Sequence, residues 1–279
     1  MKISAKMADE PDPVGVEPDG TGEKMEAVLA QSTGFFRERP VASGLASVFS
    51  AVWVHRMDER DVPPIVITPD ATIDLQWIDG RFRVAGPDKE PQIERPAAGA
   101  TIIGFRFRPG AAAGWLGVPA SEIVGGRFAL ADLWGTRSRE LSDRVKVTPD
   151  LADTVRQLEE TIGAHTQEHE AADPQMAKAF ATIDDGLPPE TPLVPFLLDR
   201  LAMSERTLRR RFEDAFGYGP KTLDRILRFH RFRRLQRAAG DASTALLAIE
   251  AGYADQAHLI RESRRLSGVT PSALPDAAT

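Results

Sequence analysis

Two arginine-bearing segments in the last third of the sequence carry residue types that contact double-stranded nucleic acid. The first segment, Ser204–Phe212, places Arg206, Arg209 and Arg210 on one helical face, with apolar residues on the opposite face. Arginine donates paired hydrogen bonds to guanine edges in the major groove, and it also binds phosphates. Ser204 is a favourable N-cap, because its hydroxyl oxygen accepts hydrogen bonds from the free backbone N–H groups at a helix start. We therefore expect a helix that begins after Ser204 and turns its cationic side toward a polyanion.

The same pattern recurs 51 residues later, and a short apolar segment precedes each copy, at Leu193–Leu201 and at Thr244–Ala251. A helix, a tight turn and a second helix with a polar outer face form a helix-turn-helix, whose second helix enters the major groove. Two copies at one offset indicate this motif more strongly than one copy does. The alternative is a helical bundle with a charged exterior. The matched positions are Ser204 and Asp255, Leu208 and Leu259, Arg210 and Arg261, Gly217 and Gly268, and Pro220 and Pro271.

Charge is distributed unevenly along the chain. The net charge is −6, yet residues 193–279 hold 15 Lys and Arg against 10 Asp and Glu. A local cationic excess attracts a polyanion even when the whole chain is acidic. Between the two copies, Lys221–Arg237 interleaves apolar residues with arginines, and its apolar side would hold the copies at a fixed spacing. The candidate phosphate contacts are Ser204, Lys221, Arg228, Arg234 and Arg265.

The front part of the chain has the pattern of short strands. Runs of aromatic and β-branched residues occur between about residues 47 and 108, and Asp79-Gly80 between two of them is a hairpin turn signal. Clean alternation at Arg81–Val84 and Phe105–Arg108 is typical of half-buried strands. Helical patterns follow at about residues 110–184. We therefore predict an α+β chain: an antiparallel β-rich barrel or sandwich-like domain with helices packed after it, then an all-α domain with two helix-turn-helix units.

Composition shifts divide the sequence into four parts. Residues 1–31 are rich in Pro, Gly and acids and are expected to form a disordered tail. Residues 32–185 form the predicted N-terminal domain, and residues 186–192 are a linker by composition. Residues 193–279 form the predicted DNA-binding domain. We recognise no secretion signal in the sequence. No apolar run approaches the ~20 residues needed to cross a bilayer. We therefore expect a cytoplasmic protein without a membrane partner.

The C-terminal third resembles the AraC/XylS family of transcription regulators. The resemblance lies in Ser204–Phe212, Gly217–Pro220, Ala251–Leu259 and Gly268–Pro271. The family's fold has two helix-turn-helix units joined by a long helix that read successive major-groove segments, and the family acts through RNA polymerase. Stretches in the front part, among them Gly104–Gly110, are similar to the sensor-like N-terminal domain of one AraC-type subgroup. This resemblance implies that residues 32–185 form a sensor or dimerisation domain.

The resemblance also implies which residues read bases. In the first unit these are Arg206, Arg209 and Arg210, and in the second unit they are Gln256, Ala257, His258 and Arg261. Three positions depart from the family pattern. Ala202 stands where the first turn usually has Gly, Ser263 stands where a bulky apolar residue commonly packs, and Leu274-Pro275 replaces an aromatic-Arg ending.

Other candidate sites are weaker. His165 and His169 lie four residues apart, a spacing at which two histidines on a helix can bind the same metal ion. In zinc proteases, however, Glu directly follows the first His, and here it does not. Surface histidines are therefore the favoured interpretation. Asp70 and Asp74 could form a carboxylate pair, although turn and strand-edge roles are commoner. Cysteine is absent, and no phosphate loop or dinucleotide fingerprint occurs. We therefore expect no cofactor, no metal and no enzyme activity.

A small-molecule effector pocket is the remaining candidate site. Pockets of this kind are apolar with few polar groups, and the candidate lining residues are Trp53, Trp77, Phe105 and Phe107, which could equally be core. The sequence thus predicts a sequence-specific transcription regulator that binds double-stranded DNA and is controlled by an effector or by homodimerisation. The alternatives are a protein-interaction adaptor with a degenerate helix-turn-helix and an enzyme domain fused to a DNA-binding module.

Overall fold

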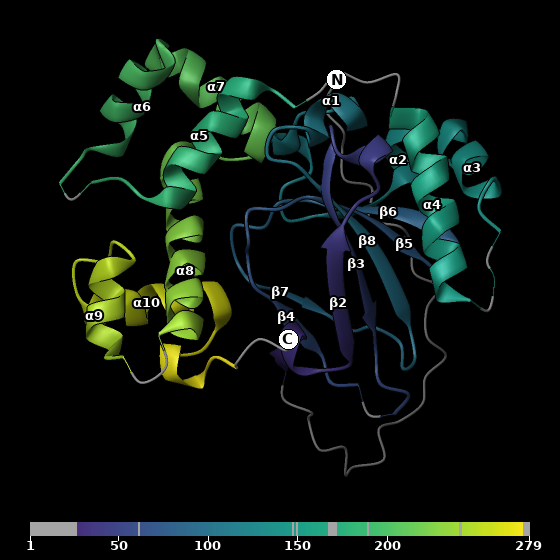
Figure 1. Cartoon of the computed structure of the whole chain (residues 1–279), viewed down its shortest axis with the longest axis horizontal. Coiled ribbons are helices and arrows are strands. Elements are labelled where there is room, and N and C mark those ends of the chain that lie inside the picture. The colour runs from purple at the N-terminus through teal and green to yellow at the C-terminus, as the bar shows by residue number, and fades with distance from the viewer. Residues whose placement is uncertain are drawn as a thin grey trace, which may run out of the picture.

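The computed structural model describes residues 27–60, 62–146, 148, 150–166, 172–188, 190–239 and 242–275. Within them, a strand-rich N-terminal domain is followed by a helical C-terminal region, which confirms the expected α+β class (Figure 1). The expected disordered tail, residues 1–31, lies outside the described residues except for 27–31. Those last residues contain strand β1 (Val28–Leu29) and the start of the 3₁₀ helix η1 (Ala30–Ser32).

Two open sheets build the N-terminal domain. The larger sheet has six strands in the order β2-β3-β8-β5-β6-β9, and all neighbours in it run antiparallel. The smaller sheet has the order β1-β4-β7, with β1 parallel to β4. The predicted barrel or sandwich is therefore realised as two sheets that do not close. The strand bounds are β2 (Phe35–Pro40), β3 (Phe49–Arg56), β4 (Ile65–Ile67), β5 (Asp74–Ile78), β6 (Arg81–Ala85), β7 (Gln92–Glu94), β8 (Thr101–Phe107) and β9 (Arg127–Ala129).

Four α-helices cover one face of the larger sheet: α1 (Ala112–Leu116), α2 (Leu130–Trp134), α3 (Thr136–Asp143) and α4 (Leu151–Thr166) (Figure 1). Successive strand residues point to opposite faces, so every second side chain enters the core beneath these helices. Leu75, Phe105 and Trp115 are among the fully or almost fully buried residues of this core. The 3₁₀ helices η2 (Ser43–Leu45) and η3 (Ala120–Glu122) complete the domain.

Six α-helices form the described C-terminal region, and two of them carry the two predicted recognition surfaces. They are α5 (Pro174–Asp185), α6 (Leu193–Leu201), α7 (Glu205–Phe216), α8 (Pro220–Ala238), α9 (Thr244–Glu250) and α10 (Gln256–Ser267), followed by η4 (Pro271–Ala273). Figure 1 shows α8 running between α6 and α7 at one end and α9 and α10 at the other. Among the described helices, none is both long enough and apolar enough to cross a membrane.

Helix α5 packs with the C-terminal helices. Its buried residues Met176, Ala179 and Ile183 share one hydrophobic cluster with α6, α7 and α8. The sequence pattern places this segment in the N-terminal domain, because the Pro-rich stretch after it has the composition of a boundary. The stretch does lie between helices, but the apolar stripe of α5 is buried against α8.

Candidate DNA-binding surface

The first helix-turn-helix is made by α6 and α7. Helix α6 ends at Leu201, and its C-cap residue Ala202 has a φ of 50°, which lies in the left-handed region. Ser204 then caps α7, and its hydroxyl accepts a hydrogen bond from Thr207 N at 3.2 Å. Leu208 and Phe212 on the inner face of α7 are 1% and 0% exposed. The predicted cap and the predicted inner face are therefore both present.

The second helix-turn-helix is made by α9 and α10 and repeats this design. Asp255 caps α10, and its carboxylate accepts from His258 N at 2.6 Å. Leu259 and Leu266 on the inner face are fully buried. Ser263 is also fully buried, and its hydroxyl donates to the Val269 carbonyl at 2.8 Å. A hydrogen-bonded serine thus fills the place where a bulky apolar residue was expected.

Helix α8 joins the two units into one body. Its first half is buried in the cluster that holds α5, α6 and α7, through residues such as Leu223 and Phe229. Its second half contributes Phe232 to the cluster that holds α9 and α10. Because close-packed side chains resist displacement, α8 fixes the spacing of the two units.

The predicted base-reading residues lie on the outer faces of α7 and α10. Arg209 and Arg210 have side chains that are 77% and 69% exposed, and each lies near an acid one turn away, Glu213 at 2.9 Å and Asp214 at 3.6 Å. The exposed members of the set are Arg206, Arg209, Arg210, Gln256, Ala257 and Arg261. His258 is the exception, because it is half-buried and its ring stacks edge-on against Tyr253 at 5.2 Å.

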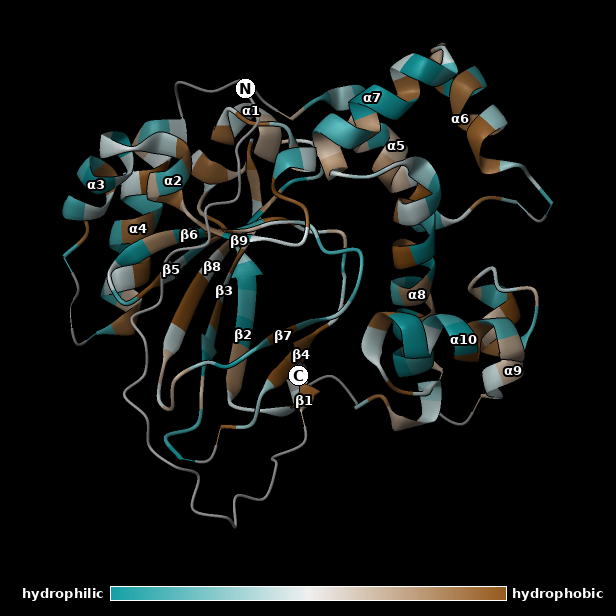
Figure 2. Cartoon of the chain, turned by 180° about the vertical axis from the view of Figure 1, so that it is seen from behind, coloured by the Kyte–Doolittle hydropathy of each residue, from teal (hydrophilic) through white to brown (hydrophobic). Residues whose placement is uncertain are grey.

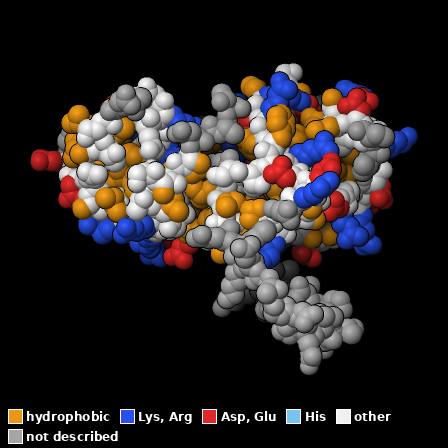
Figure 3. Space-filling model, turned by 90° about the horizontal axis from the view of Figure 1, so that it is seen from below, with side chains coloured by type: hydrophobic (Ala, Val, Ile, Leu, Met, Phe, Trp, Pro, Cys, Tyr) orange, Lys and Arg blue, Asp and Glu red, His pale blue; other side chains and the backbone are white. Residues whose placement is uncertain are grey.

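The hydropathy of the helices agrees with this placement. Figure 2 shows α7 and α10 as largely hydrophilic, and Figure 3 shows Lys and Arg side chains gathered along one edge of the half of the molecule that contains the C-terminal helices. An exposed cationic helix face of this kind is the electrostatic footprint of a nucleic-acid-binding surface.

The predicted phosphate contacts fall into two groups. Ser204, Lys221 and Arg265 are exposed. Arg228 instead forms an ion pair with Asp224 and lies over the Tyr253 ring at 5.5 Å. Arg234 forms an ion pair with Asp184 at 2.8 Å, with its side chain still 49% exposed. The second group therefore has intramolecular partners that a phosphate would have to replace.

Comparison with known families supports the assignment of this region. Residues 197–276 match a family described as a helix-turn-helix domain, of the AraC type. Residues 197–276 therefore form an AraC-type helix-turn-helix domain. Residues 37–128 match a second family, described as a domain of unknown function, DUF6597. A search of curated proteins found no match.

Several solved structures are similar to the chain as a whole. An apo point variant of ToxT from Vibrio cholerae strain SCE256 has a TM-score of 0.45 and 10% identity, over 84% of this chain and 97% of that one. ToxT from Vibrio cholerae O395 has a TM-score of 0.43 and 11% identity, over 85% of this chain and 95% of that one. ToxT from Vibrio cholerae O395 bound to (E)-4-(8-methylnaphthalen-1-yl)but-3-enoic acid has a TM-score of 0.41 and 13% identity, over 85% of this chain and 97% of that one.

The AraC-type domain is docked on the N-terminal domain. Helix α7 packs against η3, and Gly217 at the end of α7 lies close to Val124, Pro87 and the Ala120 carbonyl. From α8, a ring nitrogen of His230 donates a hydrogen bond to the Pro69 carbonyl at 2.7 Å. The orientation of the first recognition helix is therefore tied to the N-terminal domain.

A cavity of about 530 Å³ lies between the two sheets and α8. It is bounded by the face of the larger sheet that the α-helices leave uncovered. Of the four predicted effector-pocket residues, Trp53 lines this cavity. Trp77 and Phe105 lie in the core on the opposite face, and Phe107 lines a smaller cavity of about 220 Å³ beside α1.

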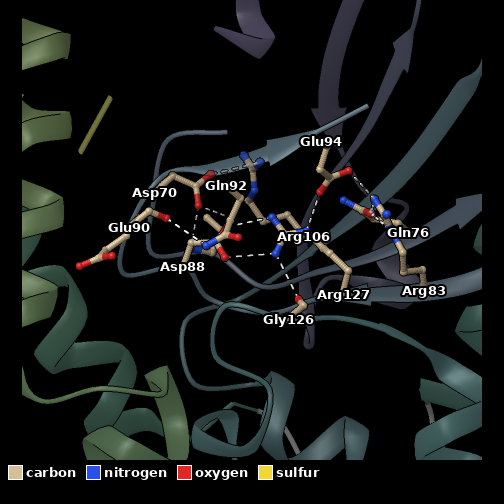
Figure 4. A network of polar contacts seen from close by, with 11 residues as sticks. Asp70, Gln76, Arg83, Asp88, Glu90, Gln92, Glu94, Arg106, Gly126 and Arg127 are labelled. Atoms are coloured by element: carbon tan, nitrogen blue, oxygen red, sulfur yellow. Dashed lines mark hydrogen bonds and ion pairs between the residues drawn. The ribbon is translucent and has the colours of Figure 1, made fainter. Parts of the chain in front are cut away.

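Polar residues that sequence reasoning missed form the floor of the larger cavity. Arg127 of β9 binds Asp88 at 2.9 Å and Glu94 at 2.7 Å, and Arg83 of β6 binds Glu94 at 3.1 Å (Figure 4). Gln76 accepts a hydrogen bond from Arg83 at 2.9 Å. The alternation in Arg81–Val84 was the available signal, because it places Arg83 on the face opposite the core.

The suggested carboxylate pair is divided by an arginine. Arg106 of β8 lies 3.7 Å from Asp70 and 3.4 Å from Asp74, and it also binds Glu38 at 2.8 Å. Burial opposes ionisation of Asp70, but the Arg106 guanidinium holds the pKa of Asp70 below its usual value. Burial raises the pKa of Asp74 despite Arg106. Asp70 also accepts hydrogen bonds from Thr72, as expected for a turn.

The suggested histidine metal site is only partly described. His165 lies on α4 against Trp115 and Trp134, and His169 lies outside the described residues. Within the part of the chain that the structure describes, no cluster of three or more His, Asp or Glu could hold a metal ion.

Proposed function

We propose that this protein is a sequence-specific transcription regulator that reads duplex DNA with α7 and α10. The observation that carries the proposal is the pair of N-capped helices with exposed cationic faces, held at the two ends of one helix whose apolar side is buried. Arginines on the outer faces would neutralise phosphates and discriminate bases. Each good bidentate contact contributes roughly 1–3 kcal/mol of discrimination.

The length of α8 supports reading of neighbouring major-groove segments. The helix has 19 residues, so it is about 28 Å long. This is close to the ~34 Å that separates successive major grooves on one face of B-form DNA. Two recognition helices at its ends would therefore reach one side of the duplex about one turn apart.

Control of this activity would come through the N-terminal domain. An effector or a change of dimer state would alter the docking of α7 on η3, and hence the way both recognition helices are presented. A change in the recruitment of RNA polymerase is the expected consequence. The adaptor alternative rests on Ser263 and Ala202, and neither residue disrupts its unit, so no observation favours it.

Selection of bound sequences from a random duplex library tests the proposal. The full-length protein should enrich a site with two conserved segments about one helical turn apart. A triple variant, Arg206→Ala, Arg210→Ala and Arg261→Ala, should not enrich it, whereas Arg156→Ala on the surface of α4 should behave as the native protein. Failure of the native protein to enrich any sequence, or equal enrichment by the triple variant, would overturn the proposal.

A further inference from the structure

The two recognition helices can be compared position by position. Helices α7 and α10 each have 12 residues, and each lies between an N-cap residue and a C-cap glycine. In each, the cap side chain accepts a hydrogen bond from the backbone N–H three residues later, at Thr207 in α7 and at His258 in α10. Every residue of α7 therefore has a counterpart 51 positions later, at the same place in α10. Differences between counterparts are differences in what the two helices present to DNA.

The exposed residues at the start of the two helices differ in chemistry. Helix α7 begins with Glu205 and Arg206, whereas α10 begins with Gln256 and Ala257, and all four are exposed. The N-terminal residues of a recognition helix contact base edges in the major groove. Glutamate accepts from cytosine N4 and arginine donates two hydrogen bonds to guanine, whereas glutamine binds adenine and alanine contacts the thymine methyl group. The start of α7 thus complements G·C base pairs, and the start of α10 complements A·T base pairs.

The third position of each helix is engaged within the protein. The hydroxyl of Thr207 lies 2.9 Å from the hydroxyl of Ser204, the N-cap residue of α7. Its counterpart His258 is half-buried, with its ring edge-on against Tyr253 at 5.2 Å. Neither side chain projects freely from its helix. The contrast between the two helix starts therefore lies in their first two residues.

The arginines of the two helices differ in whether an acid already holds them. Arg210 lies 3.6 Å from Asp214, one turn further along α7. Among the described residues, Arg206 forms no ion pair, so its guanidinium can bind a base without giving up a carboxylate. Arg261 is exposed at the place in α10 that Arg210 has in α7. Both helices can therefore contact a guanine at this later position, and the difference remains at their starts.

We propose that the two helices read segments of unlike composition: α7 reads G·C base pairs through Glu205 and Arg206, and α10 reads A·T base pairs through Gln256 and Ala257. The proposal rests on the proposed DNA-binding function and adds Glu205 to the residues that decide the sequence. Because the segments differ and α8 holds the units in a fixed order, the site has a direction. The protein then binds it in one orientation, which a palindromic site would not impose.

Selection from a random duplex library with the full-length native protein tests the composition. The enriched site should hold two segments about one helical turn apart, one with G·C base pairs and the other with A·T base pairs at the positions that tolerate no change. Two segments of the same composition would overturn this inference and leave the proposed function intact. Absence of any enriched sequence overturns the proposed function, and the inference with it.

A reciprocal pair of variants assigns each segment to its helix. Glu205→Gln should change one preferred base pair in the G·C segment, because glutamine binds adenine in place of cytosine. Gln256→Glu should make the opposite change, from adenine to cytosine, in the A·T segment. Each variant should leave the other segment as the native protein selects it. A general loss of structure would not exchange one preferred base for another, so the altered preference separates base reading from a structural role.

Fluorescence anisotropy measures the exchange. The native protein should bind the selected duplex at least about fivefold more tightly than a duplex with the single A·T base pair replaced, and Gln256→Glu should reverse this preference. Arg156→Ala on the surface of α4 is the control and should keep the native preference. An acid is favourable in the first turn of a helix, so Gln256→Glu should fold as well as the native protein.

Circular dichroism shows whether each variant is folded. Folded Gln256→Glu protein that keeps the native preference would overturn the assignment of the A·T segment to α10. Folded Glu205→Gln protein that keeps the native preference would overturn the role of Glu205. If Glu205→Gln does not fold, Arg206→Ala carries the test of α7, because it should relax the choice of base in the G·C segment alone. Relaxation of both segments by Arg206→Ala, or of neither, overturns the proposal.

Discussion

Single residues decide how the recognition helices begin and what they present. Ser204 and Asp255 cap α7 and α10 with side-chain oxygens, which fixes the first turn of each helix. Once the first turn is fixed, the 3.6-residue period places Arg210 outward and Leu208 inward. These local features depend on near neighbours in the chain, and for this reason the sequence predicted them correctly.

Arg210 should contribute to the choice of sequence more than to general affinity. Arg210→Ala is expected to weaken binding to the selected site about tenfold or more, because a bidentate contact is worth roughly 1–3 kcal/mol, and to weaken binding to random duplex much less. Lys221→Ala should weaken both equally and reduce the salt slope by about 1, as a phosphate contact does. Fluorescence anisotropy at several salt concentrations measures both. Equal losses on every sequence for Arg210→Ala would argue against base reading there.

Ala202 is strained in a way that the family's usual glycine is not. Its φ of 50° lies in the left-handed region. In this region the Cβ of a residue other than glycine crowds the backbone, which costs roughly 1–2 kcal/mol. Ala202→Gly should therefore raise the free energy of unfolding by about 0.5–1 kcal/mol after the entropy cost of glycine. Urea unfolding followed by circular dichroism measures it. Ala238→Gly, at the right-handed end of α8, is the matched control and should lower stability.

At the scale of elements, the ends of the two recognition helices differ in what surrounds them. Both α7 and α10 end in a glycine with φ near 80°, Gly217 at 79° and Gly268 at 80°. Gly217 is packed against η3 and its neighbours, whereas a Cβ at Gly268 would meet no described atom within 4 Å. The two units are thus alike internally, but only the first is fixed to the N-terminal domain at this point.

This difference gives a prediction that isolates the domain contact. Gly268→Ala should cost about 1 kcal/mol, the penalty for a left-handed alanine. Gly217→Ala should cost at least about 2 kcal/mol more, because its methyl group would overlap Val124 and Pro87. Differential scanning calorimetry of both variants measures the difference. Equal shifts in Tm would mean that α7 is not docked on η3 in solution.

The strand patterns predicted two faces for the sheet but not what covers each face. The alternation at Phe105–Arg108 and Arg81–Val84 correctly separated core from non-core positions. The preference of pockets for apolar linings pointed to Trp77, Phe105 and Phe107, but these side chains fill the core under α1–α4 or line the smaller cavity beside it. The larger cavity lies on the polar face, because the smaller sheet and α8 cover it. That cover depends on contacts between segments far apart in the chain, which no local pattern encodes.

At the scale of the whole molecule, a buried histidine joins the two domains. Burial lowers the pKa of His230 below its ordinary value of 6.5, although Asp70 and the hydrogen bond to Pro69 oppose the shift, while Arg233 and Arg234 add to it. The unfolded chain therefore binds a proton at His230 more readily than the folded protein does. Stability from this group is present above pH 6.5 and is lost as the pH falls through 6.5 toward the lower folded pKa.

Acidification should accordingly loosen the docked arrangement. Between about pH 7.5 and 5.5 we expect the Tm of the native protein to fall more steeply than that of His230→Gln, which keeps a donor for Pro69 but does not titrate. Scanning calorimetry at several pH values measures both slopes. Parallel slopes for the two proteins would show that His230 is not the titrating group.

The position of α5 bears on how such regulators are assembled from parts. The helix precedes the Pro-rich stretch at 186–192, yet its apolar residues are buried in the same hydrophobic cluster as those of α6, α7 and α8. A chimera made by joining a foreign sensor at that stretch would remove α5 and leave the apolar sides of α6 and α8 without its cover. Exchange of modules, in the laboratory or by recombination, would therefore have to cut the chain upstream of Pro174 to give a transplantable unit.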